Sequence, residues 1–145
     1  MTKRRIDTGP RLGDLVEAAK GLAHPARLRL LGMLAGGELC VCQMIAVLGL
    51  APSTVSKHLS VLAHGGLVSE RKEGKLVFYR LRDDGLAAAL LPPFLSLLDE
   101  DPGARAERTL VDRLRQVPVA TLCAAELDLA AVGVRSPESS ETHAS

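Results

Sequence analysis

The most restrictive feature of the sequence is a fixed succession of two short helical patterns, a turn and a strand–turn–strand pattern. The first helical pattern begins at Glu38 or Leu39, continues to Leu48 and is closed by Gly49. The second begins at Pro52, because proline suits the first turn of a helix. Residues 67–82 then hold two short strand patterns around a Gly-containing turn, which predicts a β-hairpin.

Helical patterns flank this central segment on both sides. Apolar residues at helical spacing predict further helices over 12–22, from Pro25 to Leu34, from Asp83-Asp84 to Leu98, and from Gly103 to Gln116. Pro92-Pro93 lies inside the third of these. Because proline clashes with the preceding turn, we expect that helix to break or kink there.

The length of 145 residues fits one domain with a single core. With no Trp, one Tyr and two Phe, that core must be aliphatic. We expect a flexible N-terminal arm over residues 1–10, a main domain over 11–117, and a C-terminal extension over 118–145. The extension is expected to be partly disordered, because 119–134 are weakly patterned and the last ten residues are rich in Ser and Glu.

Charge is distributed unevenly along the chain. Residues 1–82 hold 13 Lys and Arg against 6 Asp and Glu, whereas residues 83–145 hold 5 against 11. A basic first part favours a polyanionic partner. No apolar run approaches the ~20 residues of a membrane span, and no apolar stretch follows the first charges. We therefore expect a cytoplasmic protein with no membrane partner, in which the three cysteines are thiols.

The two central helices and their turn fit a helix-turn-helix, and the hairpin after them fits a wing. In such units the N-terminal residues of the second helix contact base edges in the major groove of DNA. The alternative is an amphipathic helix with a solvated polar face. The candidate groove contacts are Ser53, Thr54, Ser56, Lys57 and His58.

Basic residues also gather on or beside the hairpin. Lysine and arginine there are placed to contact phosphate, which contributes affinity that falls as salt rises. The candidate wing contacts are Arg71, Lys72, Lys75 and Arg80.

Four segments together resemble the ArsR/SmtB family of bacterial metal-responsive repressors. They are LAHPARLRLLGML at 22–34, ELCVCQM at 38–44, APSTVSKHLSVLAHGGLV at 51–68 and ERKEGKLVFYRL at 70–81. The resemblance covers roughly residues 12–100. It implies a winged helix-turn-helix of mostly α class with a β-hairpin wing (α+β), and a homodimer formed through the first and last helices. It also implies a repressor that leaves double-stranded operator DNA when a metal or metalloid binds.

Cys40 and Cys42 are the candidate inducer ligands. On a regular helix positions i and i+2 point about 200° apart, so we expect binding of one ion by both thiols to distort the start of the helix over 39–48. That helix positions the recognition helix, which gives a route from ligand to DNA. Thiols near a helix N-terminus also tend to have a lowered pKa, and thiolates select soft ions.

The ELCVC segment is similar to the box of arsenic-responsive members. That box often continues with a third cysteine, where this chain has Ile45. We therefore hypothesise a three-sulfur As(III) or Sb(III) site from Cys40, Cys42 and Cys123, with Cd(II) or Pb(II) as alternative inducers. Cys123 could instead be a small buried apolar side chain.

Other functions fit the sequence less well. A zinc site of the last-helix type has no His between residues 84 and 116. His24 and His64 are expected at a helix start and a helix end. Cys40 and Cys42 could sense an oxidant or reactive sulfur instead, or the wing fold could bind a partner other than DNA. A thiol enzyme is disfavoured, because Cys-x-Cys is not the Cys-x-x-Cys redox motif.

Overall fold

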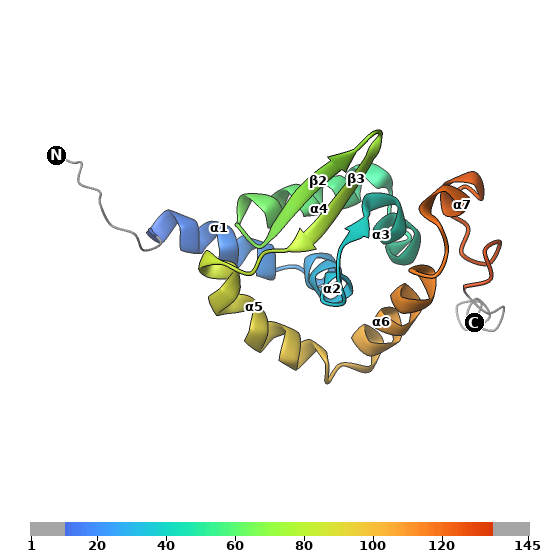
Figure 1. The fold of residues 1–145 in the computed structure, drawn as a ribbon. Coiled ribbons are helices and arrows are strands. Elements are labelled where there is room, and N and C mark those ends of the chain that lie inside the picture. The colour runs from blue at the N-terminus through green and yellow to red at the C-terminus, as the bar shows by residue number, and fades with distance from the viewer. Residues whose placement is uncertain (1–10, 135–145) are drawn as a thin grey trace.

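The computed structural model describes residues 11–134. A small antiparallel sheet lies among helices, and the chain runs from α1 on one side of the sheet to α7 on the other (Figure 1). The elements in chain order are α1 (Leu12–Leu22), α2 (Pro25–Leu34), β1 (Leu39–Cys40), α3 (Val41–Leu48), α4 (Pro52–His64), β2 (Val68–Glu73), β3 (Leu76–Leu81), α5 (Gly85–Leu98), α6 (Pro102–Leu114) and α7 (Val119–Ala124).

The core is aliphatic, as the composition requires, and α2 lies at its centre. This helix contacts α1, α3, α4, α5 and α6 as well as strand β3. Its Leu30 and Leu31 are fully buried, and so are Leu59 and Leu62 of α4. Full burial of a leucine side chain stabilises a fold by roughly 1.5–3 kcal/mol, so this contact between helices holds the recognition unit on the rest of the domain.

The predicted helix-turn-helix is confirmed. Helix α3 ends at Gly49, which has a left-handed φ of 69° and donates its N–H to the carbonyl of Ile45 at 2.9 Å. Glycine adopts this conformation without steric penalty, and it is the usual residue after a helix end. Pro52 then opens α4, whose Val55, Leu59 and Leu62 face the core.

The sheet has one strand more than expected. Strands β2 and β3 form the predicted antiparallel hairpin, and β1 pairs with the other edge of β3, with Leu39 opposite Tyr79 and Cys40 opposite Phe78. The prediction that a helix begins at Glu38 or Leu39 is therefore wrong. Pairing with β3 holds Leu39 and Cys40 in extended conformation, and α3 begins only at Val41.

The expected break at Pro92-Pro93 does not occur. Helix α5 continues from Gly85 to Leu98 with both prolines inside it. The missing proline N–H groups leave the carbonyls of Ala88 and Ala89 without their usual helical donors. Both alanines and both prolines are exposed, so water can satisfy these carbonyls and the helix is retained.

Residues 118–134, which the pattern left without an element, pack on the domain. Helix α7 contacts α3, and Leu122, Leu129 and Val134 are buried. The N-terminal arm and the final Ser/Glu-rich residues lie outside the described range. Within residues 11–134 no single helix is long and apolar enough to cross a membrane, and α3 and α4 reach that length only as a pair bent by 116°.

Candidate functional site

Cys40 and Cys42 lie side by side at the junction of β1 and α3. Cys40 is the residue before the first turn of α3 and has extended dihedrals, whereas Cys42 belongs to that first turn. Their sulfur atoms are 3.0 Å apart, well beyond the ~2.05 Å of a disulfide bond. Because Cys40 lies outside the helix, the two thiols share a side without any distortion of α3. The predicted helical position of Cys40, on which the expected distortion depended, is therefore wrong.

Gln43 fixes the geometry of this junction. The backbone N–H of Cys40 donates to Oε1 of Gln43 at 2.7 Å, and the Cys40 sulfur accepts from the backbone N–H of Gln43. This reciprocal arrangement is a capping box with cysteine in the place of serine. The Cys-x-x-Gln spacing is the local signal that could have indicated the role of Gln43.

The structure brings the third thiol close to the pair. Burial raises the pKa of the Cys42 thiol, the hydrogen bond with Cys40 raises it further, and the neighbouring Cys123 thiol makes a smaller contribution in the same direction. The expected lowering of the thiol pKa is thus wrong for Cys42, because burial and neighbouring sulfurs disfavour the thiolate in the free protein. Cys123 itself is exposed on α7, which contradicts its interpretation as a buried apolar residue.

Two of the three sulfurs come from the consecutive elements β1 and α3, whereas the third comes from α7, which lies far along the chain. Across residues 11–134, however, no three His, Cys, Asp or Glu side chains are already arranged around one ion position. A three-sulfur site therefore requires a rearrangement of these side chains. Exposure of Cys123 leaves its side chain free to make that adjustment.

The candidate groove contacts lie at the start of α4, in two groups. Ser53, Ser56 and Lys57 are exposed, and Thr54 and His58 are half-buried. The exposure of Ser53, Ser56 and Lys57 matches what a DNA-contacting face requires, while the opposite face of α4 lies in the core.

His58 is engaged inside the protein through residues of the α2 region. Nη1 of Arg27 lies 3.2 Å from Nδ1 of His58, and the His24 ring is 4.5 Å away between centroids. Burial lowers the pKa of His58, with smaller contributions from His24 and Arg27. His24 is the N-terminal cap of α2, as expected, and its Nδ1 accepts from the N–H of Ala26 at 3.0 Å.

A groove of about 480 Å³ runs between the wing, α3 and α4. Cys40 and Cys42 line it together with Ser56 of α4 and with Lys72 and Lys75 of the hairpin. The thiol pair and three of the candidate DNA contacts therefore share one concave surface. Of the two remaining wing candidates, Arg80 is exposed on β3.

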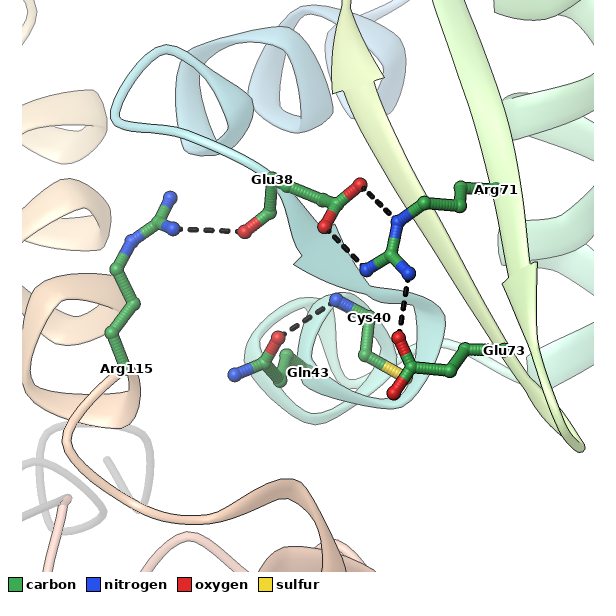
Figure 2. Close-up of polar contacts among 6 residues, drawn as sticks. All are labelled: Glu38, Cys40, Gln43, Arg71, Glu73 and Arg115. Atoms are coloured by element: carbon green, nitrogen blue, oxygen red, sulfur yellow. Dashed lines mark hydrogen bonds and ion pairs between the residues drawn. The ribbon is translucent and has the colours of Figure 1, made fainter.

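Arg71 is held by two carboxylates, as Figure 2 shows. Its Nε and Nη2 donate to the two oxygens of Glu38 at 3.0 and 2.7 Å, and its Nη1 donates to Glu73 at 2.6 Å. The Arg71 guanidinium holds the pKa of Glu38 below its usual range. The charge of this candidate phosphate contact is thus compensated within the protein.

Arg115 binds the backbone of the loop between α2 and β1, which carries Glu38. From just after α6, it donates to the carbonyls of Glu38 at 2.9 Å, Gly37 at 3.0 Å and Met33 at 3.3 Å. Sequence reasoning missed Glu38 and Arg115, because their partners lie 33 and 77 residues away along the chain. No local spacing signals such contacts.

The chain resembles known transcriptional regulators in sequence and in structure. The family model described as "Bacterial regulatory protein, arsR family" matches residues 24–70. A biofilm growth-associated repressor of Agrobacterium fabrum is 47% identical over 68 residues, which are 47% of this chain and 58% of that protein. The chain thus spans little more than half the length of this relative.

Two solved structures share the fold. The homodimeric winged helix-turn-helix domain of Mb0332 from Mycobacterium bovis is 34% identical with a TM-score of 0.54, covering 61% of this chain and 82% of that one. The antimony-specific transcriptional repressor AntR is 34% identical with a TM-score of 0.51, covering 69% of this chain and 90% of that one. These likenesses confirm the winged helix-turn-helix fold.

Proposed function

Because the chain belongs to the ArsR family of bacterial regulatory proteins, we propose that it is a repressor that leaves its operator when As(III) or Sb(III) binds Cys40, Cys42 and Cys123. The observation that carries this proposal is the shared groove. There the thiol pair lies beside Ser56, Lys72 and Lys75. A ligand on the sulfurs is then next to the surfaces that would hold DNA. The regulatory names of the relatives favour a non-enzymatic role.

DNA binding is assigned to α4 and the wing. Ser53, Ser56 and Lys57 project from α4 into solvent and are suited to bases and phosphates of the major groove. Lys72 and Lys75 extend the basic surface onto the hairpin. Affinity from such contacts falls steeply with salt.

Dimer formation is assigned to α1, because this helix has an exposed apolar face in addition to the face that packs on the domain. The inner face of α1 packs Ala18 and Gly21 against the domain. On the outer face Leu12, Leu15 and Val16 are 79%, 43% and 45% exposed. An unpaired apolar face of this kind suits a twofold contact with a second copy. Two copies would place two α4 helices about 34 Å apart on DNA.

The choice of As(III) or Sb(III) follows from the ligands. Thiolates select soft ions, and three thiols suit a soft ion that accepts three sulfurs. The name of AntR, an antimony-specific repressor at 34% identity, favours the same class of inducer. Cd(II) and Pb(II) remain alternative inducers through Cys40 and Cys42.

The deciding experiment is fluorescence anisotropy of the full chain on its upstream promoter DNA, titrated with arsenite, antimonite and Cd(II). We expect release by low micromolar arsenite or antimonite in the wild type and no release in Cys40→Ser. Lys57→Ala is the matched control, because it should weaken DNA binding while arsenite binding to the free protein stays unchanged. DNA binding that ignores all three ions would exclude the proposed inducers.

A second candidate function is oxidant or reactive-sulfur sensing by the same repressor. The 3.0 Å between the two sulfurs and the exposure of Cys123 favour it. Mass spectrometry after mild peroxide decides between the two. If arsenite still binds but neither sulfenate nor disulfide forms, oxidant sensing is excluded.

A further inference from the structure

Glu38 connects the cysteine junction to the wing through a two-point ion pair. It precedes Cys40 by two residues, and both of its carboxylate oxygens accept from Arg71 of β2, at 2.7 and 3.0 Å. In Figure 2 the Arg71 guanidinium lies between Glu38 and Glu73. Two parallel charge-assisted bonds fix relative orientation as well as distance.

The strand register places this ion pair beside the thiol pair. Phe78 of β3 lies opposite Cys40 on one side and opposite Arg71 on the other. The Arg71 guanidinium lies over the Phe78 ring at 4.5 Å from its centre. A shift of Cys40 against β3 therefore changes the position of Glu38 relative to Arg71.

The Glu38 backbone is also anchored away from the wing. Arg115 donates to its carbonyl at 2.9 Å and to that of Gly37 at 3.0 Å, which ties the loop to the end of α6. The segment that carries Cys123 begins directly after Arg115. Because the loop that contains Gly37 and Glu38 contacts both Arg71 and Arg115, a movement of this loop displaces both the wing and the segment that carries Cys123.

We propose that Glu38 is a positioning residue that transmits occupancy of the thiols to the wing through Arg71. The inference rests on the proposed inducer function. In the free protein the ion pair between Glu38 and Arg71 fixes the hairpin relative to the start of α3, while Glu73 of the same strand holds the Arg71 guanidinium in place. When the thiols close on one ion, Cys40 moves, the carboxylate of Glu38 moves with it, and the wing shifts from the DNA-binding position.

The test compares Glu38→Gln with Glu73→Gln. Each variant removes one carboxylate from Arg71, but only Glu38 lies on the cysteine loop, whereas Glu73 belongs to the wing itself. The measured quantity is the ratio of operator dissociation constants with and without saturating arsenite. We expect a ratio of at least about tenfold in wild type and Glu73→Gln, and below about threefold in Glu38→Gln. This ratio measures the coupling between the thiol site and the DNA-binding surface, and that coupling is lost when Glu38 no longer connects them.

Salt dependence provides a control. In Glu38→Gln the Arg71 guanidinium keeps its ion pair with Glu73, so no cation is freed for phosphate, and the slope of log affinity against log salt should stay close to that of the wild type. A lost response to arsenite with unchanged salt dependence and unchanged arsenite binding is a result that a merely structural role would not give. Arsenite affinity of the DNA-free variant should equal that of the wild type, which shows that the thiol site is intact.

The outcomes separate this inference from the proposed function. If the wild type ignores arsenite, the inducer function fails. If the wild type responds and Glu38→Gln responds equally, only the role of Glu38 is overturned. Should Glu38→Gln fail to fold, Arg71→Met tests the same link from the wing side, and an unchanged ratio in that variant overturns the proposal.

Discussion

Cys123 differs from the other two thiols because it is exposed and lies on an element that the sequence pattern did not predict. If it is the third ligand, Cys123→Ser should weaken arsenite binding about tenfold or more, equivalent to roughly 1.4 kcal/mol. An exposed substitution should change the free energy of unfolding by less than about 0.5 kcal/mol. Arsenite titration by near-ultraviolet absorbance measures the first quantity. Unchanged arsenite affinity would exclude the three-sulfur site.

His58 should make stability depend on pH. Its pKa is lowered in the folded protein, so the unfolded chain takes up a proton at higher pH than the folded one. The contribution of His58 to the free energy of unfolding is therefore close to zero above the unfolded pKa of about 6.5, and it becomes destabilising as pH falls through that value. Urea unfolding from pH 7.5 to 5.5 should show a smaller loss of stability in His58→Gln than in the wild type.

The control for this prediction is His64→Gln. It removes an imidazole that is 75% exposed at the end of the same helix, and a loss of stability that is smaller in His58→Gln than in both the wild type and His64→Gln assigns the effect to His58. An equal loss of stability between pH 7.5 and 5.5 in His58→Gln and the wild type would show that His58 does not contribute.

At the scale of elements, α1 and α4 pack closely enough to require glycine at one point. A Cβ at Gly65 would lie 2.7 Å from the carbonyl oxygen of Glu17 and 3.1 Å from Cα of Ala18. Gly65→Ala should therefore destabilise the fold by about 1–3 kcal/mol, because backbone must move to relieve the contact. Thermal unfolding measures the change.

Gly13→Ala provides the matched control on α1. Nothing lies within 4 Å of a Cβ at that position, and alanine favours a helix over glycine by roughly 0.5–1 kcal/mol. The same substitution should thus stabilise the protein at residue 13 and destabilise it at residue 65. Equal effects at both sites would contradict the close packing of α1 on α4.

For the whole molecule, the exposed apolar face of α1 and the uneven charge point to a dimer on a polyanion. Val16→Glu should give a monomer in analytical ultracentrifugation and weaken operator binding, since a monomer holds only one half-site. Val16→Leu keeps an apolar side chain and should remain dimeric. A dimeric Val16→Glu variant that binds DNA normally would place the contact elsewhere.

Helix positions and the winged helix-turn-helix were predictable because they depend on local periodicity and on punctuation by Gly and Pro. The predicted bounds of α1 and α2 and the predicted start of α4 agree with the structure for this reason. The local patterns gave wrong predictions where neighbouring elements or solvent changed the local preference. Pairing with β3 gives Leu39 and Cys40 strand conformation where a helix was predicted, and solvent around Ala88 and Ala89 lets α5 continue through two prolines.

The winged helix-turn-helix, the polar start of α4 and the identity of the thiols follow from residue type and short spacing alone. Packing of the helices and strands establishes which of those residues meet. It placed Cys40 outside the helix and beside Cys42, and it brought Cys123 to them by folding α7 onto α3. It also joined Arg71 to Glu38, 33 residues away. Such contacts depend on how elements pack, which no local pattern encodes.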